Sequence, residues 1–220
     1  MSKSKKKRRK RKSIFKRILA LFILGLIVYG CFFFRIETIE IFKPNNDSDI
    51  VDTDVLPKET SLSLVMVGDA LIHSAVYYDA QVDNTYNFKP MLDIMKPIIS
   101  SYDLAYYNQE TILGGSELGL STYPRFNSPY ELGNDFLDTG FNIVSMANNH
   151  TLDRGEQAII NSCNYWKTKD VYTAGSYCSE EDREEIKIFE KNGIKYAMLS
   201  YTTTTNGLKA PSGKEYFLNV

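Results

Sequence analysis

The chain has 220 residues, of which 43% are hydrophobic, and its formal net charge is −1. This length allows one domain with additional segments. The near-zero charge conceals an asymmetry, because residues 1–17 contain eleven Lys and Arg and no acidic residue. The remaining 15 basic residues stand against 27 acidic ones, a net charge of −12. The composition therefore excludes a uniformly basic protein and indicates two oppositely charged parts.

The segment 18–34 contains seventeen residues without a charge and separates these two parts. As a helix that rises ~1.5 Å per residue it would be roughly 25 Å long, and Lys16 and Arg17 could snorkel to complete a bilayer crossing. Basic residues flank only its N-terminal side, so the positive-inside rule places residues 1–17 in the cytoplasm and the remainder outside. We therefore expect a single-pass protein of the cell membrane, with the lipid bilayer as a partner.

Three alternatives compete for this N-terminal region. A cleaved signal peptide would end in small residues, whereas Tyr29 and the phenylalanines at 32–34 are bulky. Cys31 weakly resembles a lipoprotein acceptor, and the same bulky neighbours argue against that role. The basic tail could bind nucleic acid in isolation, but beside an apolar segment it is better explained as a topology signal on anionic lipid. We expect an uncleaved anchor and no nucleic-acid partner.

Residues 35–60 are polar and acidic, and they contain Pro44 and Pro57. This pattern is typical of a linker, so we expect the main extracytoplasmic domain at 61–220. Within it, Cys163 and Cys178 could form a disulfide in an oxidising compartment. A buried thiol on a helix and a separate thiol in a loop account for the pattern at least as well.

The hydrophobic pattern from residue 61 onward alternates between strand and helix. We expect strands at 62–67, 104–107, 141–147 and 171–175, and helices at about 90–98, 129–140 and 156–167. Pro97 should bend the first helix and Ser128 should cap the second. The dipeptide Asn192-Gly193 predicts a hairpin between 185–190 and 194–201. This order predicts an α/β domain with a mostly parallel core and one antiparallel hairpin.

Three of the expected strands end in polar side chains that can bind a metal. Asp69 follows the first strand, Asn108 and Glu110 follow the second, and Asn149 and His150 follow the third. In open α/β sheets, ligands bind where the carboxyl ends of the strands meet. The sequence therefore predicts a metal-centred site at this edge. For each residue taken alone, a helix cap or an ordinary turn is the alternative.

His150 and Asp153 are the catalytic candidates. A neutral imidazole can ligate a metal or, if it is free, protonate a leaving group. The carboxylate three residues later could hold the other ring nitrogen and fix the tautomer. The alternative is that both side chains only stabilise a buried loop.

The metal-binding candidates are Asp69, His73, Glu110 and Asn149. Carboxylate and amide oxygens suit hard divalent cations, and His73 would share a face with Asp69 if the intervening segment is helical. The identity of the ion stays open among Mn, Mg, Zn and Fe.

The segment 123–129 supplies a candidate for substrate binding. Arg125 lies among aromatic residues ahead of a helix, which suits recognition of a phosphate or a carboxylate. A rigid loop with a surface arginine fits the pattern equally well. Asn108 projects to the same side of its strand end as Glu110 and could hold a substrate oxygen.

The motifs GDALIH, DLAYYNQET, YPRFNSP and GFNIVSMANNHTLDRG occur in this order at residues 68–155. In order and spacing, the sequence over about 61–205 resembles the CapA family of poly-gamma-glutamate capsule biosynthesis proteins, which is related in fold to calcineurin-like metallophosphoesterases. The resemblance implies a metallophosphoesterase-like α/β sandwich, anchored by a single transmembrane helix, that serves synthesis or export of an anionic polymer with synthase subunits. It places Asp69, Glu110, Asn149 and His150 on metal or catalytic positions, with His73, Asn108 and Asp153 as further matches.

The chain departs from that pattern in its second half. Metallophosphoesterase-type sites are completed by later histidines, whereas no histidine follows His150. We therefore expect an incomplete C-terminal half of the sandwich and ligands for one metal rather than two. A metal-dependent hydrolase, a non-catalytic assembly subunit and a degenerate fragment are the three functional hypotheses.

Overall fold

The computed structural model of the protein describes residues 59–220. The expected basic tail (1–17), transmembrane helix (18–34) and nearly all of the linker (35–60) lie outside these residues. Within residues 59–220, no helix combines the length and the apolar character needed to cross a membrane.

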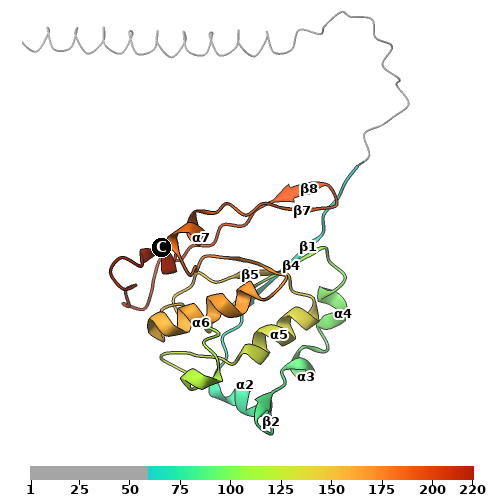
Figure 1. The fold of residues 1–220 in the computed structure, drawn as a ribbon. Coiled ribbons are helices and arrows are strands. Elements are labelled where there is room, and N and C mark those ends of the chain that lie inside the picture. The colour runs from blue at the N-terminus through green and yellow to red at the C-terminus, as the bar shows by residue number, and fades with distance from the viewer. Residues whose placement is uncertain (1–58) are drawn as a thin grey trace, which may run out of the picture. The chain divides into compact units, whose positions relative to one another are not determined.

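A four-stranded parallel sheet forms the centre of the domain (Figure 1). The strands are hydrogen-bonded in the order β1 (Leu64–Asp69), β4 (Leu104–Asn108), β5 (Ile143–Ser145) and β6 (Tyr172–Ala174). Each connection between them contains helix, which is what parallel neighbours require because a short turn cannot return the chain to the same end. The predicted α/β class with a parallel core is confirmed.

The sheet is covered on both faces at the central strand β4, whereas Leu64 and Met66 of the edge strand β1 are exposed. Ala105 and Tyr107 belong to the core cluster that includes Leu132 and Trp166 of the helices. Leu104 packs in a separate cluster with Phe189 of the hairpin. The major helices α5 (Tyr130–Thr139) and α6 (Gly155–Lys167) therefore cover one face, and the hairpin segment covers part of the other (Figure 1).

The remaining elements are short. They are α2 (Ser74–Asp79), β2 (Gln81–Val82), β3 (Thr85–Tyr86), α3 (Lys89–Leu92), α4 (Lys96–Ile99), η1 (Ser116–Leu118), α7 (Glu180–Glu184), β7 (Phe189–Lys191), β8 (Ile194–Tyr196) and η2 (Glu215–Phe217). The antiparallel β7–β8 hairpin confirms the predicted turn, with Asn192 and Gly193 at φ 54° and 78°. Both strands of the hairpin are shorter than their apolar pattern suggests.

Three local expectations were wrong. Pro97 does more than bend a helix, because α3 and α4 are separate helices and Pro97 occupies the first turn of the second. Ser128 does not cap α5, which has Pro129 at its N-cap, because its hydroxyl donates to Thr111 Oγ1 (2.8 Å). No helical turn links Asp69 to His73, since His73 is the extended N-cap of α2.

The two cysteines of the domain are free. Cys163 is buried on α6, and Cys178 is partly buried in the loop before α7. The structure shows no disulfide between them, although Cys178 packs against the hydrophobic cluster that contains Cys163.

Substituting Leu132 by Ala tests the helical layer, because this side chain is 1% exposed and packs against the sheet. We expect the free energy of unfolding to fall by about 2–5 kcal/mol, from lost burial and the cavity left behind. Leu199, which is 83% exposed, is the matched control, and its replacement by Ala should change the value by less than about 0.5 kcal/mol. Urea denaturation measures both, and equal effects would contradict the assigned core.

Candidate active site

The site lies where β1, β4 and β5 end side by side. The parallel register aligns Asp69 with Asn108, and Asn108 with Ser145. Residues that follow these three positions are therefore brought together although about forty residues separate each strand from the next. Just beyond β1, the Ala70 N–H donates to the Asn108 carbonyl oxygen (2.8 Å), which continues the pairing of the two segments past Asp69.

A chain of amide hydrogen bonds crosses the three strand ends. Asn108 Nδ2 donates to Asp69 Oδ1 (2.9 Å), and Asn148 Nδ2 donates to Asn108 Oδ1 (3.3 Å). The Asn148 Oδ1 in turn accepts the backbone N–H of His150 (3.0 Å). Asn108 and Asn148 thus fix the relative positions of the Asp69 carboxylate and the His150 backbone.

Glu110 lies between Asp69 and His150 at the centre of this edge. Its side chain is only 12% exposed, and its Oε1 is 3.8 Å from His150 Nε2. Burial raises the pKa of Glu110, and the nearby negative charge of Asp69 raises it further, while His150 acts in the opposite direction. Two carboxylates that repel each other in a partly buried place favour a bound cation between them.

His150 is held in one orientation by Asp153. Its Nδ1 is 2.8 Å from Asp153 Oδ2, and the Asp153 side chain is 1% exposed. A carboxylate only accepts hydrogen bonds, so Nδ1 carries the proton and Nε2, which faces Glu110, is unprotonated in the neutral ring. The backbone N–H of Phe126 also donates to Asp153 Oδ2 (2.7 Å), which fixes the carboxylate itself.

His73 is set apart from this group. Its Nδ1 is 3.3 Å from Thr122 Oγ1, and its ring packs edge-on against Phe126 with centroids 5.1 Å apart. Phe126 also packs against His150, at 4.7 Å between centroids. The two histidines therefore pack against the same ring, that of Phe126.

Asn149 and Arg125 line a cavity of about 490 Å³ beside His150. The other lining residues are Tyr123, Pro124, Asp153, Asn206 and Leu208. Asn149 Nδ2 donates to Asn206 Oδ1 (3.3 Å). The adjacent asparagines 148 and 149 therefore differ in role, since the first braces the strand ends and the second faces the cavity.

A family model described as bacterial capsule synthesis protein matches residues 63–218, a range that includes every residue of this site. This chain belongs to the CapA family of bacterial capsule synthesis proteins. The predicted family is therefore confirmed. No curated protein matches the chain in a sequence search.

Sequence reasoning about this CapA-family chain missed two residues of the site, Asn148 and Asn206. Asn148 stands in the same motif as His150, and its role is visible only through its contacts with Asn108. Asn206 does carry a sequence signal, because Asn206-Gly207 is a typical tight-turn dipeptide. A turn alone, however, does not show which distant segment it contacts.

The donor atoms at the strand ends fit a divalent cation in chemistry. Asp69 and Glu110 supply two carboxylates. The Nε2 of His150, whose other ring nitrogen is held by a carboxylate as is common for metal-binding histidines, is either a further donor or, when protonated, an acid. In the part of the chain that the structure describes, no group of three or more His, Cys, Asp and Glu side chains has the arrangement of a metal site. Any such ion therefore depends on amide or solvent oxygens as further ligands.

Replacing Glu110 by Gln tests the repulsion between the two carboxylates. We expect the metal-free variant to be more stable than the wild type at pH 8, because the partly buried charge beside Asp69 is removed. Each ~1 kcal/mol gained should raise the melting temperature by about 2–4 °C. Thermal unfolding in the presence of EDTA measures the difference. The exposed Glu190 is the control for Glu→Gln replacement, and a decrease for Glu110→Gln would contradict the proposed repulsion.

Proposed function

We propose that this protein is a membrane-anchored component of the synthesis or export of an anionic capsule polymer such as poly-gamma-glutamate, with a metal-dependent hydrolase site of the phosphoesterase type. The convergence of Asp69, Glu110 and His150 at one sheet edge is the observation that carries the proposal. The family match supports the link to capsule synthesis. The anchor would be the apolar segment 18–34, with synthase subunits as partners in the membrane.

In this proposal a divalent cation is held by Asp69 and Glu110, with Asn149 as a further oxygen donor. When bound, such an ion polarises a phosphoryl or carbonyl oxygen and lowers the pKa of a coordinated water. The two carboxylates neutralise the ion, and their partial burial limits competition from solvent.

His150 serves as the general acid of the proposed reaction. Once its Nε2 is protonated, that nitrogen can donate the proton to a leaving-group oxygen, while the Nδ1–H stays hydrogen-bonded to Asp153. The carboxylate stabilises the charged ring and keeps Nε2 directed toward the strand ends. Arg125, which lines the same cavity as His150, supplies positive charge for an anionic part of the substrate.

The double variant Asp69→Asn, Glu110→Gln tests the metal site with little change in side-chain shape. We expect its affinity for Mn²⁺ or Zn²⁺ to fall at least about 100-fold, because both carboxylate ligands are removed. Metal content of the full-length protein after dialysis, measured by mass spectrometry, gives the result. The exposed Asp138, which pairs with Lys96 (2.7 Å) away from this edge, is the control as Asp138→Asn. Unchanged metal content in the double variant would exclude this mechanism.

A non-catalytic assembly subunit is the second candidate. It is favoured by the lack, among residues 59–220, of a complete group of three His, Cys, Asp or Glu ligands. The same double variant separates the two functions in cells. Capsule assembly that persists without the metal ligands supports the assembly subunit, and its loss, with normal protein levels in the membrane, supports the hydrolase.

Asp153→Asn tests how His150 is oriented. An amide can present its NH₂ group to Nδ1 and thereby favour the wrong tautomer, as in other carboxylate–histidine pairs. We expect hydrolysis of a generic phosphodiester to slow by about 10–100-fold while bound metal is retained. A chromogenic bis-aryl phosphate gives the rate. An unchanged rate would remove Asp153 from the catalytic arrangement.

A further inference from the structure

The cavity beside His150 contains a cation without a partner. Among residues 59–220, the Arg125 guanidinium makes no hydrogen bond or ion pair, and Arg125 is exposed at the cavity. A guanidinium presents five N–H donors in a planar arrangement that matches carboxylate and phosphate oxygens. An arginine left free in this position is available to a ligand.

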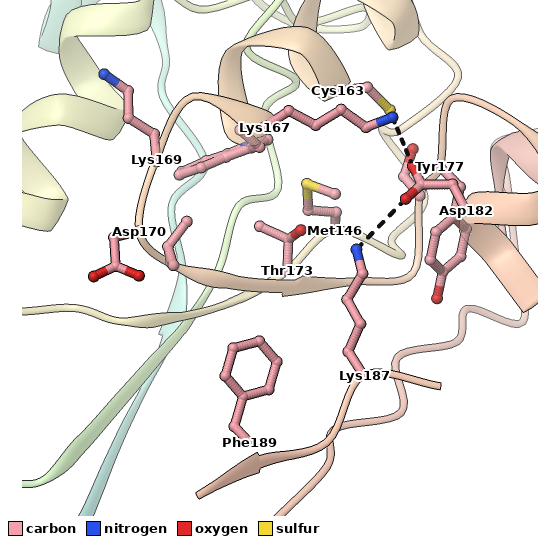
Figure 2. A pocket seen from close by; sticks show the side chains of 13 residues that line it. Met146, Cys163, Lys167, Lys169, Asp170, Thr173, Tyr177, Asp182, Lys187 and Phe189 are labelled. Carbon is pink, nitrogen blue, oxygen red and sulfur yellow. Dashed lines mark hydrogen bonds and ion pairs between the residues drawn. The ribbon is translucent and has the colours of Figure 1, made fainter. Parts of the chain in front are cut away.

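A second cavity, of about 380 Å³, shows the contrasting case (Figure 2). It is lined by three lysines, of which Lys167 and Lys187 point their Nζ atoms to the same Asp182 carboxylate, at 3.2 and 3.5 Å. These two lysines therefore share one carboxylate of the chain, and the third, Lys169, places its Nζ over the Tyr165 ring (4.8 Å to the centroid). The Arg125 cavity differs in that its cation has neither a carboxylate nor an aromatic ring as a partner among residues 59–220, and it lies beside His150.

Asn206 reaches the Arg125 cavity from a tight turn. The Leu208 N–H donates to the Thr205 carbonyl oxygen (2.9 Å), and Asn206 and Gly207 have φ of 52° and 78°. Positive φ at both central residues defines a type I′ turn, for which Asn-Gly is the preferred pair. The turn holds the Asn206 side chain against Asn149 and His150.

The Nδ2 group of the Asn206 side chain has hydrogens that are not used in a hydrogen bond within the described residues. Its Nδ2 is 3.4 Å from His150 Nδ1, but that nitrogen carries a proton that is donated to Asp153. Two donors cannot bond to each other, so the contact is one of packing, and the Nδ2 hydrogens remain for a ligand. The Asn206 Oδ1 is already occupied by Asn149, which fixes the amide in this orientation.

We infer that this cavity binds an oxyanion of the substrate, a carboxylate or a phosphate, through the Arg125 guanidinium and the Asn206 amide. Asn206 is then a substrate-positioning residue that places the anion next to His150. This inference rests on the proposed function only in naming the bound anion as substrate.

The net negative charge of the domain means that long-range attraction does not bring an anion to this cavity. Residues 59–220 contain 12 Lys and Arg against 21 Asp and Glu, so their net charge opposes the approach of an anion. Binding therefore depends on short-range contacts with a free guanidinium and amide donors. Such contacts discriminate strongly between a ligand that carries the oxyanion and one that lacks it.

The test is a ligand-observed NMR titration of the full-length, metal-free protein with inorganic phosphate and, separately, with glutarate. We expect Arg125→Ala and Asn206→Gly each to weaken binding of the recognised anion about tenfold, because each removes a hydrogen bond to a charged ligand. Glycine is chosen at 206 because it keeps the positive φ of the turn. The probe that binds more tightly identifies the oxyanion as phosphate or carboxylate.

Matched controls exist for both variants. Lys187→Ala removes a cation from the second cavity, and Asn192→Gly removes an asparagine from the positive-φ turn of the β7–β8 hairpin. Both should bind the anion as the wild type does. No binding of either probe to the wild type, or equal weakening in the controls, overturns the inference.

The same titration separates this inference from the metal proposal. The Asp69→Asn, Glu110→Gln variant should retain anion binding, since neither residue lines the cavity. If its metal content is also unchanged, the metal site fails while the anion site stands. If metal is lost but Arg125→Ala binds normally, the metal site stands and the anion site fails.

Discussion

The parallel alignment of β1, β4 and β5 is the constraint on which the rest of the site depends. It places Asp69 beside Asn108 and Asn108 beside Ser145, so three separate segments deliver their polar residues to one edge. A shift of one residue in a strand would turn alternate side chains to the opposite face and would separate the carboxylates. Burial of β4 on both faces opposes such a shift of this strand, because Leu104 and Ala105 pack in different core clusters.

Several polar side chains at this edge of the sheet lower the stability of the folded protein when no ligand compensates them. Glu110 is desolvated and repelled by Asp69, which raises its pKa, and Asp153 is almost fully buried with one oxygen, Oδ1, unpartnered. Uncompensated groups of this kind are uncommon in the interior of proteins and cluster at functional sites. The free energy gained by burying the hydrophobic core offsets the cost of these groups. A bound cation would reduce the repulsion between the Glu110 and Asp69 carboxylates.

Positive charge is distributed differently in the two cavities beside the sheet. In one, Lys167 and Lys187 neutralise the partly buried Asp182 and tie α6 to the segment around α7. In the other, Arg125 has no partner among the described residues and lines the same space as the His150 ring. Pairing within the chain makes the first group structural, and the free guanidinium gives the second its capacity to bind.

The sequence by itself determined the α/β class, the order of the major elements and the family, because hydrophobic periodicity, the Asn192-Gly193 turn and the motif order are local properties of the chain. It also predicted that Asp69, Glu110 and His150 lie close together, since polar side chains that follow three neighbouring parallel strands are presented at one edge of the sheet. Only the tertiary structure decided which of these residues meet. It set His73 apart against the Phe126 ring, a contact that nothing in the GDALIH motif predicts, and it brought Asn206 to the site. Such contacts join distant segments, and their positions depend on how the sheet and its loops pack and not on any local pattern.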